Sequence, residues 1–168
     1  MYFFTATINS WQNLLEEITF KKIVLDSLHF MHHEKRAQIN GFVIMPNHIY
    51  LLWTPSENNE EELNENALLS FTAHQFKKNL KNHHPELLKN YVSTQNDREY
   101  HFWERRPRTI EVLSRKIAEQ KLEYIHSNPC HERWKLALEP NKYYYSSALF
   151  YETELDDFKF LTHINESL

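Results

Sequence analysis

Two short stretches of the sequence carry side chains that could act together on a phosphate group. His48 and Tyr50 stand two positions apart in a β-forming run, so both side chains would project from the same face of a strand. Tyr124 and Asn128 stand four positions apart in an amphipathic run, which places them about 40° apart around a helix axis. If that helix lies across the strand, an imidazole, an amide oxygen and one or two phenols converge. Such a group suits a divalent cation and a phosphate.

The apolar pattern predicts the elements that must position these side chains. Aromatic and β-branched runs predict strands at 2–8, 38–45, 48–53 and 101–103, and Pro46-Asn47 marks a hairpin turn. Apolar residues at three- and four-residue steps predict helices at 20–36, about 69–80 and 110–126, with an exposed loop at 55–64 and irregular chain at 82–99. This order predicts the α+β class, with an antiparallel sheet and helices packed on one face. The sheet face that carries His48 and Tyr50 is then expected to be polar.

Length and composition exclude several classes of protein. A chain of 168 residues predicts one domain, 1–168, and we treat 140–168 as its C-terminal extension. The only glycine is Gly41, so the Gly-rich phosphate loops of nucleotide-binding folds cannot be built. The only cysteine is Cys130, which excludes an internal disulfide framework and fits a reduced, cytoplasmic setting. No apolar run is long enough to cross a bilayer, so we expect a soluble protein with no membrane partner.

Charge is distributed unevenly along the chain. The formal net charge is −4, but the runs 57–65 and 152–157 together hold nine acidic residues and no Lys or Arg. Basic residues gather elsewhere and could attract phosphate locally, although a solvated helix face and an exposed basic loop are the alternative interpretations. The candidate DNA-binding residues are Lys77, Lys78, Lys81, Arg105, Arg106 and Arg108.

Three motifs, in order, resemble one family. The run Phe42-Val43-Ile44-Met45-Pro46-Asn47-His48-Ile49-Tyr50-Leu51-Leu52-Trp53 resembles the signature strand of the single-tyrosine HUH transposases, a superfamily that includes insertion-sequence transposases. Tyr124-Ile125-His126-Ser127-Asn128-Pro129 resembles the nucleophile helix of its REP-associated tyrosine transposase branch, and Tyr143-Tyr144-Tyr145-Ser146-Ser147-Ala148 resembles the C-terminal signature of that branch. With Trp103 and Phe4-Thr5-Ala6-Thr7, the resemblance covers nearly the whole chain.

The resemblance implies a fold, a reaction and roles for particular residues. It implies a ferredoxin-like sheet and an enzyme of DNA transposition that cleaves and rejoins single-stranded hairpin DNA through a covalent 5′-phosphotyrosine intermediate. Tyr124 would be the nucleophile, and His48 and Asn128 would hold a divalent metal, Mg²⁺ or Mn²⁺. Covalent catalysis of this kind retains the phosphoester energy for rejoining and needs no ATP. Among the relatives some act as homodimers and others as single chains, so the resemblance leaves the oligomeric state open.

The sequence departs from the family pattern at Tyr50, where the second histidine of the metal motif is expected. A phenol with an ordinary pKa of about 10 coordinates metal poorly at neutral pH, so we expect a weakened metal site with Tyr50 as a lining residue. The alternative function is therefore a catalytically impaired, domesticated nucleic-acid-binding module. The acidic net charge suggests a third class, a protein-interaction domain.

Two positions on the nucleophile helix have competing interpretations. Gln120 lies one turn before Tyr124 and is either a second lining residue, standing in as a ligand, or a solvated helix residue. Asn128, which precedes Pro129, is either a metal ligand or a cap for the helix end.

Overall fold

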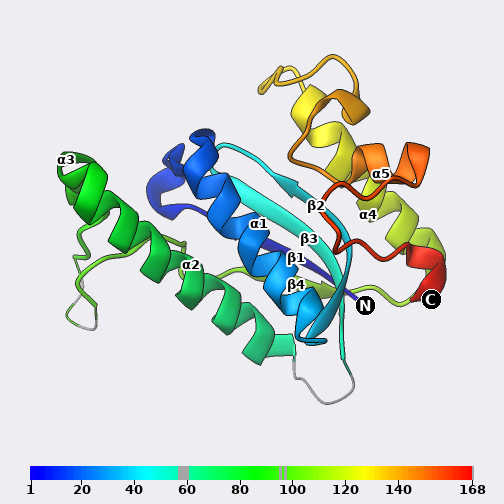
Figure 1. Cartoon of the computed structure of the whole chain (residues 1–168), viewed down its shortest axis with the longest axis horizontal. Helices are drawn as coiled ribbons and strands as arrows, with labels where there is room; N and C mark the ends of the chain where they lie inside the picture. Colours follow the sequence, from blue (N-terminus) through cyan, green and yellow to red (C-terminus); the bar gives the residue numbers. More distant parts are fainter. Residues whose placement is uncertain (57–60, 95, 97, 168) are drawn as a thin grey trace.

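Four antiparallel strands form the sheet at the centre of the protein, in the order β2-β3-β1-β4 (Figure 1). The computed structural model describes residues 1–56, 61–94, 96 and 98–167, without the side chains of 61–63. The strands are β1 (Tyr2–Thr7), β2 (Ala37–Ile44), β3 (His48–Pro55) and β4 (Arg108–Glu111). With one helix after β1 and another after β3, this is the ferredoxin-like βαββαβ arrangement. The predicted α+β class and antiparallel sheet are confirmed.

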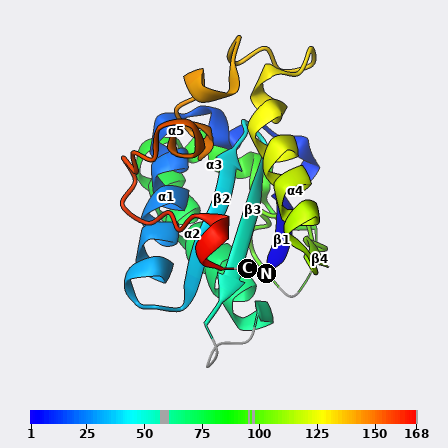
Figure 2. The same ribbon diagram turned by 90° about the vertical axis from the view of Figure 1, so that its right-hand side faces the viewer.

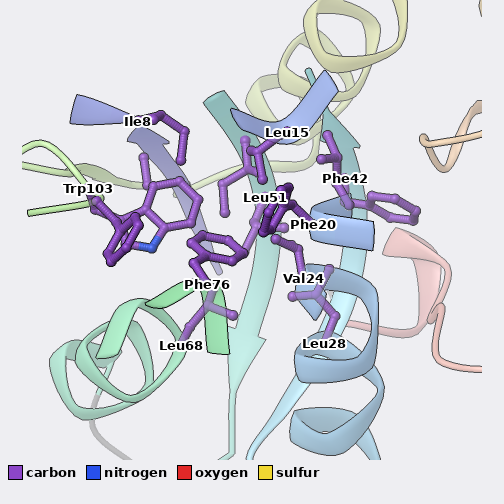
Figure 3. Packing of buried hydrophobic residues seen from close by; sticks show 14 of the residues in the cluster. Ile8, Leu15, Phe20, Val24, Leu28, Phe42, Leu51, Leu68, Phe76 and Trp103 are labelled. Carbon is purple, nitrogen blue, oxygen red and sulfur yellow. The ribbon is translucent and has the colours of Figure 1, made fainter. Parts of the chain in front are cut away.

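Helices cover both faces of this sheet. Helix α1 (Ile18–His33) and helix α2 (Glu61–His83) share one face and contact each other. Figure 3 shows Phe20 and Phe76 from these helices packed beside Leu51 of the sheet, within the larger of two apolar clusters. Helix α4 (Arg115–Ser127) covers the opposite face, as the turned view in Figure 2 shows. The expectation of helices on one face therefore holds for α1 and α2 and is corrected for α4.

Burial on both faces of β2 and β3 explains this layering. Phe42 and Ile44 face the α1 side, whereas Val43 joins Leu122 of α4 in the second apolar cluster. A strand that is apolar on both faces must be covered on both. Gly41 lies where a Cβ atom would overlap Leu122 Cδ2, so the single glycine gives α4 room to approach the sheet. The second face is therefore largely apolar, not polar as the sequence predicts.

The boundaries of the fourth strand and the last long helix differ from the predicted ones. Trp103 makes only an isolated bridge with Ile8, and the fourth strand lies later, at β4. Helix α4 begins after Ser114, whose hydroxyl accepts a hydrogen bond from the Ile117 amide as an N-cap. The three-residue step from Ile110 to Leu113 imitates a helix, but β4 and its exit are extended.

Two other segments also differ from expectation. Helix α2 begins at Glu61, inside the stretch predicted as a loop, and positions 57–60 of that stretch lie outside the described residues. A short helix, α3 (Pro85–Leu88), interrupts the segment predicted to be irregular. No helix in the described part of the chain is both long and apolar enough to span a membrane.

The C-terminal segment closes the free edge of β2. The Ile44 amide donates a hydrogen bond to the Tyr145 carbonyl, and the Tyr143 hydroxyl donates one to the Ile44 carbonyl. Helix α5 (Ala148–Thr153) follows, and Phe160 returns to the larger apolar cluster. An open strand edge can pair with the strands of other chains, and this segment prevents such pairing at β2.

The docking of α4 can be tested with two Leu→Ala substitutions. We expect Leu122→Ala to lower the free energy of unfolding by about 2–5 kcal/mol, because it leaves a cavity against β2. Leu113→Ala is the matched control: its side chain is 76% exposed, so the change should stay within about 0.5 kcal/mol. Urea unfolding monitored by circular dichroism measures both values. Equal losses would indicate that both leucines pack in the core.

Candidate functional site

The two stretches that the sequence predicts to converge do meet. Tyr50 of β3 and Tyr124 of α4 are hydrogen-bonded through their hydroxyl groups at 3.0 Å, although 74 positions separate them. The Phe3 ring stacks on Tyr50 and meets Tyr124 edge to face. Tyr124 is 47% exposed, so one edge of the phenol packs against the sheet and the other faces solvent. The Tyr124 hydroxyl is therefore accessible and also held in place.

His48 is buried in a neutral state with a defined tautomer. Its Nδ1 lies 2.7 Å from the Asn47 Oδ1. Because a carboxamide oxygen only accepts hydrogen bonds, Nδ1 carries the proton and Nε2 keeps its lone pair. Burial lowers the His48 pKa to about 4, which outweighs the raising effect of the nearby Asn128 side chain, and Arg133 lowers it further. At neutral pH the imidazole can therefore act as a ligand or a hydrogen-bond acceptor.

Asn128 brings a second lone pair to the same place. It is buried at the end of α4, in a right-handed conformation. Across the described residues, neither the Asn128 Oδ1 nor the His48 Nε2 has a hydrogen-bond partner within bonding geometry, although Asn128 lies near enough to favour a proton on His48. Asn128 occupies the C-cap position of α4, but without the left-handed backbone that a capping asparagine commonly adopts. Two buried acceptors side by side suit a cation or a donor from a ligand.

These residues fit only part of a divalent metal site. A neutral imidazole and an amide oxygen are suitable ligands, but no group of three or more His, Cys, Asp or Glu that could hold a metal occurs in the described part of the chain. Tyr50 does not complete the set. Burial and the hydrogen bond with Tyr124 raise the Tyr50 pKa above its ordinary value, so its phenol stays protonated. The donor set provides two neutral protein ligands.

A cavity of about 710 Å³ opens beside these groups. The sheet register builds its floor: Thr5 lies between Tyr50 on one side and Arg108 on the other, and Thr7 pairs with His48. Residues opposite one another in antiparallel strands project to the same face. Phe3 of β1 and its partner Ile110 of β4 also line the cavity. The other side chains come from the turn after β1, the loop before β4, and α4. The full lining is Phe3, Thr5, Thr7, Trp11, His48, Tyr50, Glu104, Arg106, Arg108, Ile110, Lys121 and Tyr124.

The structure divides the predicted basic residues into two groups. Arg106 and Arg108 line the Tyr124 cavity, whereas Arg105 lines a different one, between α2 and the loop before β4. Lys77, Lys78 and Lys81 belong to α2, on the opposite side of the sheet from α4. Lys77 pairs with Glu99, and Lys78 lines a groove between α1 and α2. Of the six predicted basic residues, only Arg106 and Arg108 therefore line the cavity of Tyr124.

Lys121 and Trp11 are two of the lining residues that the sequence does not predict as part of the site. Gln120 is exposed and does not line the cavity, whereas its neighbour Lys121 does, with its ammonium 4.6 Å from the centre of the Phe3 ring. Helical spacing from Tyr124 includes both positions, so only the packing of α4 separates them. The second missed residue is Trp11, for which the local sequence gives no signal beyond an aromatic residue after the Asn9-Ser10 break.

Comparison with solved structures identifies the fold. This chain superposes on a REP-associated tyrosine transposase bound to a REP hairpin with a TM-score of 0.65 and 16% identity, over 97% of this chain and 86% of that one. A candidate transposase from Deinococcus radiodurans R1 gives a TM-score of 0.50 and 16% identity, over 74% of this chain and 86% of that one. The relationship predicted from the motifs is thus confirmed at the level of fold.

Sequence comparison adds nothing to this likeness. No protein-family model matches the chain, and no curated protein matches it.

Burial of neutral His48 predicts acid sensitivity. Its folded pKa of about 4 lies below the ordinary 6.5, so the unfolded chain binds the proton more tightly. The contribution of His48 to the free energy of unfolding is therefore largest above pH 6.5. It falls by at most about 3 kcal/mol as the pH drops from 6.5 to 4. His126, whose pKa burial also lowers to about 4, acts in the same direction. NMR titration of the His48 ring protons isolates its share, and a midpoint near 6.5 would contradict the burial of a neutral ring.

Proposed function

We propose that this protein binds single-stranded DNA folded into a hairpin and, as a transposase-like enzyme, cleaves and rejoins it through Tyr124. The observation that carries the proposal is the accessible Tyr124 hydroxyl, which shares a basic cavity with the buried acceptor of His48. The likeness of fold to a transposase bound to a REP hairpin supports the hairpin as the form of substrate.

The chemistry follows from the position of Tyr124. Its phenolic oxygen would attack the scissile phosphorus, and the bond to the 3′ oxygen would break, so that the leaving strand carries a 3′ hydroxyl and the other strand a 5′ phosphotyrosine. A 3′ hydroxyl attacking the phosphotyrosine reverses the exchange and releases Tyr124. One phosphoester replaces another in each step, so no external energy is needed. Arg106, Arg108 and Lys121 would balance the phosphate charge in the cavity.

His48 Nε2 and Asn128 Oδ1 are the two protein ligands that would hold a divalent ion, Mg²⁺ or Mn²⁺. When bound, the ion would polarise the phosphodiester. With neutral Tyr50 in the third position, water would occupy the place of the missing ligand, which makes binding weak. The hydrogen bond between the Tyr50 and Tyr124 hydroxyl groups holds the proposed nucleophile in position when no metal is bound.

The second candidate function is DNA binding without cleavage. The hydrogen bond between Tyr50 and Tyr124 favours it, because the position where the family pattern expects a second histidine is taken by a phenol committed to the nucleophile. The basic cavity would be retained in such a module.

Substitution of Tyr124 tests the covalent step. With Mn²⁺ and a hairpin oligonucleotide labelled 3′ to the cleavage site, we expect a protein-DNA adduct in denaturing gels. Tyr124→Phe should abolish the adduct and change binding affinity by less than about threefold, since it removes one hydroxyl. Tyr144→Phe, at a phenol that is 57% exposed elsewhere, is the matched control and should leave the adduct intact. An adduct that survives Tyr124→Phe would sink the assignment of the nucleophile.

Restoring the family residue at position 50 tests the metal site. We expect Tyr50→His to bind Mn²⁺ at least about tenfold more tightly than the natural chain in calorimetry, because a neutral imidazole replaces a protonated phenol. Tyr50→Phe, which removes only the hydroxyl, should not strengthen binding. Equal affinity in the natural chain and Tyr50→His would refute the weakened site. An adduct formed only by Tyr50→His would select the function without cleavage.

A further inference from the structure

Trp11 is exposed in a position that its own backbone disfavours. Its indole is 58% exposed, and Ser10 and Trp11 are consecutive residues with φ of 57° and 56°. Left-handed backbone is unfavourable for residues with a Cβ atom and persists where surrounding contacts impose it. A large apolar side chain gains nothing from solvent exposure, so burial of the indole does not explain this conformation.

Hydrogen bonds to two other parts of the chain hold the turn around Trp11. The Asn47 Nδ2 donates to the Trp11 carbonyl at 3.1 Å, and the Ser10 amide donates to the Glu104 Oε1 at 2.8 Å. The Asn9 amide donates to the Phe102 carbonyl at 2.7 Å, and the buried Leu15 follows. The backbone is therefore fixed from both sides, while the indole is left uncovered. This is a rigid support for an exposed aromatic ring.

The indole lines the same cavity as Tyr124, where its neighbours favour a nucleic acid. Arg106 and Arg108 from the loop and strand β4, and Lys121 from α4, face this cavity with one carboxylate, that of Glu104. The Glu104 carboxylate already accepts the Ser10 amide. An aromatic ring beside cationic side chains matches the two parts of a nucleotide, because the ring stacks on the base and the cations attract the phosphate. A neutral peptide has no anionic group to pair with these cations, whereas every nucleotide of a DNA strand has one.

We propose that Trp11 is the stacking platform for an unpaired nucleobase of single-stranded DNA, next to the segment whose phosphate lies by Tyr124. The proposal rests on the proposed function, which it deepens by adding a base-binding subsite. Arg106, which lines the same cavity, pairs with a phosphate of that strand. The subsite recognises the flat face of a base, so it binds any unpaired base next to a hairpin. It does not bind the paired bases of the stem, whose faces are covered by their neighbours.

Two oligonucleotides separate this subsite from hairpin binding in general. One is a fluorescently labelled hairpin with blunt ends, and the other is the same hairpin with single-stranded extensions of four thymidines on both sides. We expect Trp11→Ala to weaken binding of the extended hairpin at least fivefold in fluorescence anisotropy and to leave binding of the blunt hairpin unchanged. Trp11→Phe, which keeps an aromatic face, should recover most of the affinity.

Two controls distinguish loss of stacking from loss of folding and from the general effect of removing an exposed aromatic ring. Phe30→Ala removes an aromatic ring that is 52% exposed on α1, across the sheet from α4, and should bind both oligonucleotides like the natural chain. Thermal unfolding verifies that Trp11→Ala remains folded at the assay temperature. Intrinsic fluorescence gives a second readout: the extended hairpin should quench the natural chain, and Trp11→Phe should lose this quenching although it still binds.

The outcomes distinguish the two proposals. Equal binding of the extended hairpin by the natural chain and Trp11→Ala overturns the stacking subsite and leaves the proposed function standing. If Trp11→Ala weakens binding of both oligonucleotides to the same extent, the stacking subsite is also overturned, because Trp11 would then not contact an unpaired base. Failure of the natural chain to bind either oligonucleotide overturns the proposed function, and the subsite with it.

Discussion

The packing of α4 on the second face of the sheet is the constraint on which the site depends. Ala118, Leu122 and Ile125 turn inward from α4, and Gly41 leaves room for the helix to approach β2. Tyr124 directly precedes Ile125, so it lies at the border of the buried face, with half of its ring against the sheet. If α4 lay closer to the sheet the Tyr124 hydroxyl would be buried, and if it lay farther away the hydroxyl would lose its contact with Tyr50.

One amide side chain connects two residues that line the cavity, His48 and Trp11. The Asn47 Oδ1 accepts a hydrogen bond from the His48 Nδ1–H, and the Asn47 Nδ2 donates one to the Trp11 carbonyl. The first bond fixes the imidazole tautomer, and the second holds a backbone conformation that would otherwise be unfavourable. Asn47 is itself buried, so its bond with His48 is shielded from competing water, and its bond with Trp11 is partly shielded. The turn between β2 and β3 thus positions both the His48 imidazole and the backbone of Trp11.

The electrostatics of the site are local and differ from those of the whole chain. Desolvation keeps His48 neutral, and Tyr50 stays protonated, so the inner wall carries no charge of its own. Positive charge comes from Arg106, Arg108 and Lys121, which line the same cavity. The formal net charge of −4 has little bearing on this, because interactions between exposed charges fade over about 10 Å at ordinary salt.

The sequence by itself determined the elements with strong local periodicity and the faces of short segments. It placed β1, α1, β2 and β3, put His48 and Tyr50 on one face of a strand, and put Tyr124 and Asn128 on one side of a helix. Local periodicity does not say which face of a sheet a helix covers. Only the tertiary structure therefore decided that α4 lies opposite α1 and α2, and that the α2 lysines are remote while Trp11 and Lys121 line the cavity. These choices depend on long-range packing, since β2 and β3 bury both faces and each needs its own cover.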